Sequence, residues 1–284
     1  MKKSALFYKI SGNTSPEAQT VVLSSGLGGV NGFWQPQRAM LEKYFRVVVY
    51  DQFGTGGSKG KVPAGYRMED MADELAELLA MLEVDRCHLV GHALGGIIGL
   101  HLAQRYPSLL ESLVVINGWT KLDSQTRRCF EVRQNLLLNS GVEAYVQAQP
   151  LFLYPAEWLS ANASLLNQEQ THQAAHFQGA ENLLHRLQAL MASNLEDSLE
   201  NITTPTLAFS CKDDLLVPWH CSATLAHGLP LGEHLQMSYG GHAMSVTDSE
   251  TFNSLLLEWL LRFAPQTLNP TETSLLPETP WPKP

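Results

Sequence analysis

Cys87-His88-Leu89-Val90-Gly91-His92-Ala93-Leu94-Gly95-Gly96 is the stretch that decides the fold. Residues 87–90 predict a buried strand, the Gly-x-Ala-x-Gly segment predicts a sharp turn, and the apolar residues that follow predict a helix. This strand–turn–helix pattern is typical of a nucleophile elbow, in which the central residue is a serine. The central residue here is Ala93, which has no hydroxyl group to attack a substrate.

Apolar strands alternate with helices on both sides of this elbow. Buried strands are predicted at 20–24, 46–50, 87–90, 112–116, 205–210 and 234–237. An amphipathic helix is predicted over 68–82, and a last helix over 249–263. Continuously apolar strands that alternate with helices form parallel sheets covered on both faces. The sequence therefore predicts an α/β fold with a mostly parallel, doubly wound sheet.

The alternation stops between residues 120 and 204, where helical periodicity appears without a convincing strand. We therefore predict an α/β core domain made of residues 1–119 and 205–264, with 120–204 inserted as a helical lid. Residues 265–284 contain several prolines and little pattern, and we expect them to form a mobile tail.

The composition of the chain indicates which kinds of partner it can bind. The formal net charge of −9 argues against nucleic acid or an anionic membrane as the main partner, and no apolar run reaches the ~18 residues of a transmembrane helix. The four cysteines form no C-x-x-C pair and are typical of reduced thiols in a cytoplasmic protein. We expect a small-molecule substrate; the composition is compatible with a homodimer.

An acid and a histidine follow the elbow in the order expected of the α/β-hydrolase fold. Asp214 lies just beyond the strand predicted at 205–210, and His242 lies in a Gly-Gly-His turn after the strand at 234–237. A solvated turn explains either Asp213 or Asp214 taken alone, and a lone histidine is more often structural. The combination with the elbow favours a catalytic Asp214–His242 pair, beside Ala93 at the nucleophile position.

The turn after the first predicted strand has two interpretations. Gly26 and Leu27 are placed to supply an oxyanion-hole N–H, with Leu94 supplying the second. The run Gly26 to Gly32, followed by Asp51 about 20 residues on, also resembles a dinucleotide-binding fingerprint. Its sixth position is Asn31, however, and Trp34-Gln35-Pro36 stands where the phosphate-binding helix should begin. We therefore favour the oxyanion hole and expect no cofactor.

The predicted lid contains two groups of candidate residues. Arg127, Arg128 and Arg133 form either a solvated basic face or, if one points inward, a contact for a substrate carboxylate. His172 and His176 are four residues apart on a predicted helix, but Gln173 replaces the glutamate of the H-E-x-x-H motif. We interpret these histidines as polar surface and expect no metal site.

Six stretches of the sequence resemble the RutD family, the α/β-hydrolases of the bacterial Rut pyrimidine-utilisation pathway. They are Asn117-Gly118-Trp119, Thr126-Arg127-Arg128-Cys129-Phe130, the run from Gln149 to Pro155, the run from Ala175 to Gly179, the run from Asp213 to Pro218, and Tyr239-Gly240-Gly241-His242-Ala243. The resemblance extends from about residue 20 to 260 and includes the lid. Members of this family also read Gly-His-Ala-Leu-Gly at the elbow, so it implies that Ala93 is native. Phe53 departs from the family, in which arginine is expected after Asp-Gln.

The resemblance implies a hydrolase of C–N bonds other than peptide bonds, which releases ammonia from carbamate or aminoacrylate during uracil degradation. Without a serine at position 93, no acyl-serine intermediate forms there. We expect His242 to act instead as a general base toward water or to carry a proton to the leaving nitrogen. Three alternatives stay open: an enol-lactone-type hydrolase, a serine-independent lyase or dioxygenase, and a catalytically inactive binding protein.

Overall fold

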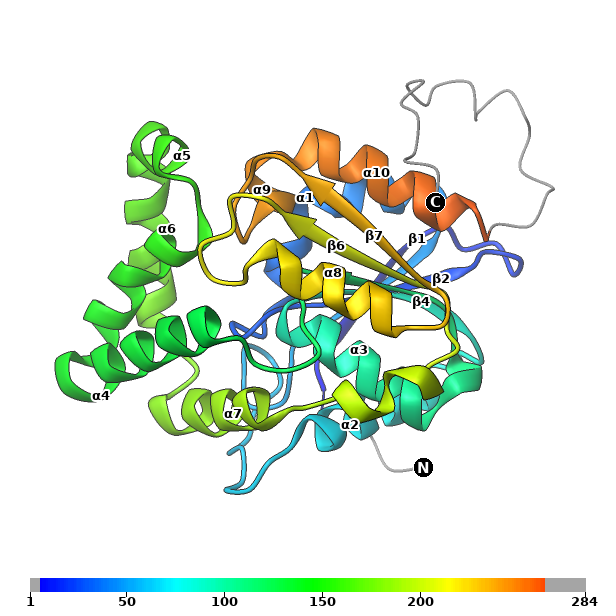
Figure 1. Ribbon diagram of the computed structural model, residues 1–284, viewed down its shortest axis with the longest axis horizontal. Helices are drawn as coiled ribbons and strands as arrows, with labels where there is room; N and C mark the ends of the chain where they lie inside the picture. The colour runs from blue at the N-terminus through cyan, green and yellow to red at the C-terminus, as the bar shows by residue number, and fades with distance from the viewer. Residues whose placement is uncertain (1–5, 264–284) are drawn as a thin grey trace.

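The sheet has seven strands in the order β1-β3-β2-β4-β5-β6-β7, and the computed structural model describes residues 6–263 (Figure 1). Strand bounds are β1 Tyr8–Gly12, β2 Thr20–Ser24, β3 Arg46–Tyr50, β4 Cys87–His92, β5 Leu110–Ile116, β6 Thr206–Cys211 and β7 Gly232–Met237. Only β1 pairs antiparallel, with β3; the other five pairings are parallel. The predicted α/β class and mostly parallel doubly wound sheet are confirmed.

All six predicted strands exist, and one strand was missed. β1 is an edge strand whose residues are exposed or half-buried, so it lacks the continuous apolar run that marks the others. β4 extends two residues beyond the predicted end and includes His92. The predicted tail at 265–284 lies outside the described residues.

Helices cover both faces of the sheet. Their bounds are α1 Gln35–Leu41, α2 Met68–Met81, α3 Leu94–Arg105, α8 Trp219–Gly228, α9 Met244–Thr247 and α10 Ser249–Leu261, with short 3-10 helices η1 Asn31–Trp34 and η2 Pro107–Leu109. Alternate strand residues point to opposite faces and build two apolar clusters. One cluster packs against α1 and α10, the other against α2, α3, α8 and the lid, and Figure 1 shows the two layers on either side of the sheet.

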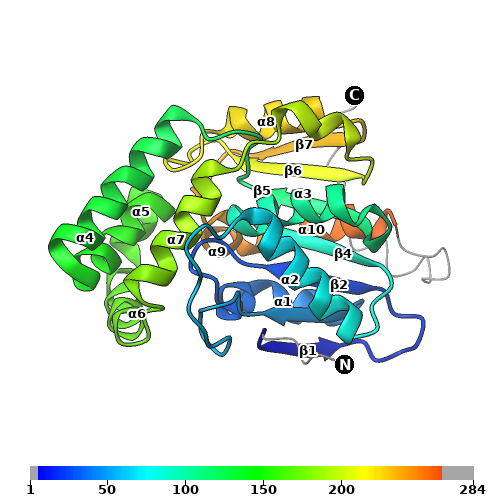
Figure 2. The ribbon, with the colours of Figure 1, turned by 90° about the horizontal axis from the view of Figure 1, so that it is seen from below.

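Residues 120–204 carry helices that lie beyond the carboxyl ends of the parallel strands (Figures 1 and 2). They are α4 Ser124–Leu153, α5 Ala156–Ala161, α6 Ala163–Ala175 and α7 Ala180–Ala192. The 3-10 helix η3 Glu196–Asn201 follows them and lies near the opposite end of the sheet, beside the last residue of α8. α4 is broken at Gly141, whose φ of 88° and ψ of −178° are not helical, so it forms two arms. The helical character of this segment agrees with the prediction; its division from the core at residues 119 and 205 stays a prediction.

No helix within residues 6–263 is long and apolar enough to cross a membrane.

Close backbone packing holds the turn between β4 and α3 against β2. A Cβ added to Gly95 would come within 2.1 Å of the Ser24 carbonyl oxygen, and one added to Gly91 within 2.4 Å of the Gly95 backbone. Backbone atoms cannot move aside as a flexible side chain can. The glycines are therefore required by the approach of α3 to the end of β2.

We predict that Gly95→Ala lowers the free energy of unfolding by more than about 2 kcal/mol, because the new methyl group overlaps the backbone of β2. Gly28→Ala is the matched control, because nothing lies within 4 Å of a Cβ at Gly28. Urea unfolding of both variants measures the difference. Equal stability of the two variants would contradict the packing described for the elbow.

Candidate active site

Ala93 occupies the strained position of a nucleophile elbow. Its φ of 47° and ψ of −109° place it between the end of β4 and the first residue of α3. The Ala93 N–H donates to the carbonyl of Ile116 over 2.7 Å, which ties the turn to the end of β5. A positive φ is costly for a residue with a Cβ, so the surrounding structure must hold this conformation. The elbow therefore keeps its backbone geometry while its side chain is a methyl group.

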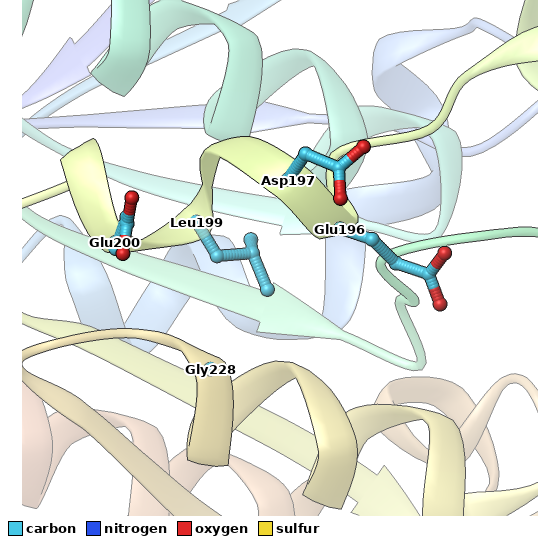
Figure 3. A pocket seen from close by; sticks show the side chains of 5 residues that line it. All are labelled: Glu196, Asp197, Leu199, Glu200 and Gly228. Carbon is cyan, nitrogen blue, oxygen red and sulfur yellow. The ribbon is translucent and has the colours of Figure 1, made fainter.

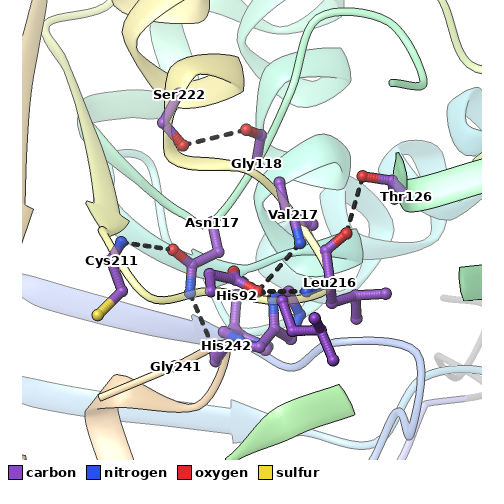
Figure 4. A network of polar contacts seen from close by, with 12 residues as sticks. His92, Asn117, Gly118, Thr126, Cys211, Leu216, Val217, Ser222, Gly241 and His242 are labelled. Atoms are coloured by element: carbon purple, nitrogen blue, oxygen red, sulfur yellow. Dashed lines mark hydrogen bonds and ion pairs between the residues drawn. The ribbon is translucent and has the colours of Figure 1, made fainter. Parts of the chain in front are cut away.

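Asp214 and His242 form a buried pair. Nδ1 of His242 lies 2.7 Å from Oδ2 of Asp214, and the two side chains are 3% and 0% exposed. The other carboxylate oxygen, Oδ1, accepts hydrogen bonds from the N–H groups of Leu216 and Val217 (Figure 4). The carboxylate thus orients the ring with Nδ1 as donor, and Nε2 has no hydrogen-bond partner within residues 6–263.

Asp213, the rejected candidate for the acid, has a different place. Its carboxylate accepts from the N–H groups of Gly240 and Gly241, over 3.3 and 2.8 Å. Both glycines have positive φ values, 133° and 66°, and they form the turn that precedes His242. The two adjacent acids therefore have different roles. Asp213 stabilises the turn before His242, and Asp214 orients the imidazole of His242.

Two residues that were not predicted hold the backbone of His242. Its carbonyl oxygen accepts from Nε2 of His92 over 2.8 Å and from Nδ2 of Asn117 over 2.8 Å (Figure 4). The His92 and His242 rings also meet edge to face, with centroids 4.7 Å apart. Both residues could have been identified from the sequence by their positions at strand ends, because His92 directly precedes the elbow residue and Asn117 directly follows β5.

The candidate oxyanion donors are the backbone N–H groups of Leu27 and Leu94. Leu27 lies in the loop after β2 and Leu94 is the first residue of α3, whose N–H has no intrahelical acceptor. Within the described residues, neither N–H donates a hydrogen bond to another residue. A Cβ at Gly26 would come within 2.8 Å of Nδ1 of His92, so glycine is required there by close approach.

Arg186 of α7, which sequence reasoning missed, ties the lid to this loop. It is fully buried and donates to the carbonyl oxygens of Leu27 and Phe53, over 3.3 and 2.7 Å, and to the side chain of Gln178. Burial lowers the pKa of Arg186 to about 10, so the group remains charged at neutral pH. The bond to Phe53 uses its backbone, while the Phe53 ring packs close to Gly60.

The three lid arginines that the sequence analysis named as candidates differ in their exposure to solvent. Arg127 and Arg128 are exposed on α4, whereas Arg133 is buried and 6% exposed. His172 and His176 are exposed, with stacked rings 4.2 Å apart, which agrees with their interpretation as polar surface. Only Arg133 of the three is buried within the lid.

The acidic residue that a dinucleotide-binding site would need, Asp51, is used in hydrogen bonds within the protein. Asp51 accepts from the N–H and side-chain amide of Asn31 and from the N–H of Gly57, so its carboxylate joins two loops. One argument against a cofactor was wrong, however. α1 begins at Gln35 with Pro36 in its first turn, where proline is well tolerated.

Asp123, His220 and Cys221 are a group that could hold a metal ion. Their ligand atoms lie within 4.8 Å of one another, at the start of α4 and the start of α8. The set combines oxygen, nitrogen and sulfur donors, which suits zinc more than magnesium or calcium. Burial raises the pKa of the Cys221 thiol to about 12, which opposes the deprotonation that metal binding requires.

A surface hollow of about 360 Å³ lies apart from the His242–Asp214 pair, between η3 and α8 (Figure 3). It is lined by Glu196, Asp197, Leu199, Glu200 and Gly228. Three of these five residues carry carboxylates and none belongs to the elbow, the acid loop or the histidine loop. We therefore locate the candidate active site at Ala93 and His242 and not at this hollow.

An elbow, an acid and a histidine, in this order at the carboxyl ends of parallel strands, define the α/β-hydrolase class. The family model described as the alpha/beta hydrolase fold matches residues 19–249. A relative from Pantoea ananatis, named "Putative carbamate hydrolase RutD", is 72% identical over 91% of this chain and 94% of its own, and one of the same name from Stutzerimonas stutzeri is 51% identical over 90% and 96%. The chain therefore belongs to the RutD family of α/β-hydrolases.

A solved structure with the same fold is the enol-lactonase from Burkholderia xenovorans LB400. It superposes with a TM-score of 0.81 over 90% of this chain and 96% of that one, at 24% identity. At this identity the likeness shows the fold alone.

Two buried histidines of β4 predict how stability depends on pH. Burial lowers the pKa of His88 to about 4 and that of His92 to about 3, below the value of about 6.5 in an unfolded chain. The unfolded state therefore binds more protons as pH falls from about 6.5 toward 4. Each histidine then removes up to about 1.4 kcal/mol of unfolding free energy per pH unit.

Urea unfolding between pH 7 and 4.5 measures this slope. His88→Asn, which can keep the hydrogen bond to Ser112, should reduce the slope by about one proton, and the exposed control His172→Ala should leave it unchanged. An unchanged slope in His88→Asn would show that His88 titrates normally in the folded protein.

Proposed function

We propose that the protein hydrolyses carbamate to ammonia and carbon dioxide during uracil degradation in the cytoplasm. The relatives at 72% and 51% identity bear the name of a carbamate hydrolase, and both cover nine-tenths of the chain. A cytoplasmic location fits the four cysteines, which are all buried free thiols. The net charge of −9 favours a small molecule as partner over nucleic acid or an anionic membrane.

The observation that carries the proposal is a complete Asp214–His242 pair beside an elbow without a hydroxyl group. No acyl-serine can form at Ala93, so ordinary ester and peptide hydrolysis loses its nucleophile. Proton transfer by His242 needs no nucleophile. Carbamate suits such a site, because protonation of its nitrogen is the step that releases ammonia.

In the proposed mechanism, an imidazolium at His242 donates its Nε2 proton to the nitrogen of carbamate. The C–N bond then breaks, its electron pair leaves with nitrogen as ammonia, and the carboxylate carbon leaves as carbon dioxide. Asp214 stabilises the imidazolium through the 2.7 Å contact to Nδ1. The N–H groups of Leu27 and Leu94 bind a carbamate oxygen, which orients the nitrogen toward His242.

We predict that His242→Ala abolishes the acceleration of ammonia release over buffer, a loss of about 10²–10⁴ if general acid catalysis supplies it. Ammonia release from freshly dissolved ammonium carbamate, followed by stopped flow, gives the rate with and without protein. His172→Ala replaces an exposed histidine and should retain the wild-type rate. Wild-type acceleration in a folded His242→Ala variant would exclude the proposed proton transfer.

We predict that a fluorophosphonate forms no adduct at position 93 of the wild-type protein and labels Ala93→Ser. The elbow conformation and the buried His242–Asp214 pair would then activate the added hydroxyl group. Intact-mass measurement counts the adducts, and Ala93→Gly serves as a control without a hydroxyl. A stoichiometric adduct on the wild-type protein would favour the enol-lactone-type hydrolase instead.

A further inference from the structure

A buried arginine in the lid lacks the partner that its charge requires. We call Arg133, Phe130, Tyr145, Gln149 and Phe152 the Arg133 cluster. All five residues belong to α4, and the break at Gly141 places Arg133 on one arm against Tyr145, Gln149 and Phe152 on the other. The guanidinium carbon lies 5.7–5.8 Å from the centres of the three aromatic rings.

Neutral groups satisfy only part of this guanidinium. Nη2 donates to the Tyr145 hydroxyl over 3.2 Å and to Oε1 of Gln149. Nε is fully buried and has no hydrogen-bond partner, and Nη1 donates to no described residue. Within residues 6–263, no carboxylate lies within ion-pair distance of Arg133. A buried charge without a counter-ion is costly, so a structural role alone explains it poorly.

Both ends of α4 contact the loops that carry the catalytic pair. At its start, the Thr126 hydroxyl donates to the Leu216 carbonyl, two residues after Asp214. At its end, the Leu153 carbonyl accepts from the N–H of Ala243, next to His242. Phe130 also packs 6.2 Å from Trp119, which follows β5, and shares one apolar cluster with Ala93. The helix that carries the Arg133 cluster therefore packs against the loops that hold Asp214 and His242.

We propose that Arg133 is the group that binds the carboxylate of the substrate, so that the protein accepts small carboxylate or carbamate anions and rejects their neutral amides. The unpaired donors of a guanidinium fit two carboxylate oxygens at once, and the aromatic rings exclude competing water. The inference rests on the proposed function for the reaction, but it concerns binding alone. It separates Arg133 from Arg127 and Arg128, which the same helix exposes to solvent.

Acetate tests the inference, because it is isosteric with carbamate and does not react. Its dissociation constant is measured by saturation-transfer NMR, with acetamide as the neutral probe of the same shape. Arg133→Met should raise the dissociation constant of acetate at least tenfold and leave that of acetamide unchanged. Arg128→Met, which removes an exposed charge from the same helix, should bind acetate like the wild type.

Gln149→Glu keeps Arg133 and places a carboxylate against it. This internal counter-ion should also raise the dissociation constant of acetate at least tenfold. Its ion pair with Arg133 offsets the loss of the hydrogen bond that Nε2 of Gln149 donates to the Tyr145 carbonyl. The variant keeps the inference testable if Arg133→Met fails to fold. Acetate binding within twofold of wild type in a folded Gln149→Glu or Arg133→Met variant would overturn the inference, as would an equal loss in Arg128→Met.

The anion subsite and the proposed reaction are tested by different measurements, acetate binding and ammonia release. His242→Ala should lose ammonia release, while acetate binding in that variant should still depend on Arg133, so that adding Arg133→Met weakens it as in the wild type. If the wild-type protein binds acetate through Arg133 but does not accelerate carbamate breakdown, the anion subsite stands and the proposed reaction fails. If it accelerates carbamate breakdown and the Arg133 variants bind acetate normally, the reaction stands and the subsite fails.

Discussion

One carbonyl oxygen, that of His242, joins the parts of the site. It accepts hydrogen bonds from His92 at the end of β4 and from Asn117 at the end of β5. Asn117 also accepts from the N–H of Cys211 at the end of β6, so three neighbouring strands meet at this point. The histidine loop, which follows β7, is thereby fixed to the strand that carries the elbow. A buried carbonyl oxygen that accepts two hydrogen bonds restricts the backbone conformation of its residue. The position of the His242 imidazole is therefore restricted as well.

The elbow shows that a strained backbone can remain useful without its usual side chain. The positive φ of Ala93 costs free energy, which the close contacts of Gly91 and Gly95 and the bond to Ile116 must offset. This conformation still fixes the direction of the Leu94 N–H, and a methyl group stands where the hydroxyl of a serine would be. These features suit a reaction whose difficult step is proton transfer and not covalent attack.

The core and part of the site could be predicted because they depend on local sequence. Six strands, the elbow and the choice of Asp214 over Asp213 follow from apolar runs and from positions at strand ends. His92, Asn117 and Arg186 were missed because their roles come from contacts across 125 to 159 residues of chain. The three lid arginines could not be separated either, because the break at Gly141 decides which side chain becomes buried.

In the proposed site, the lid and not the sheet would supply the positive charge that binds an anionic substrate. The sheet side of the site offers one carboxylate, an imidazole and neutral backbone N–H groups, and Asp214 would repel an anion that approached it alone. The two N–H donors and the imidazole offset part of that charge. Within residues 6–263, the only buried Lys or Arg side chains are Arg133 and Arg186, and both belong to the lid. Arg186 donates through its two terminal nitrogens to the loops around Leu27 and Phe53, while its buried Nε has no hydrogen-bond partner among the described residues. Within residues 6–263, Arg133 keeps two guanidinium nitrogens, Nε and Nη1, without a hydrogen-bond partner, whereas Arg186 keeps only Nε, so Arg133 offers more donors to an anion.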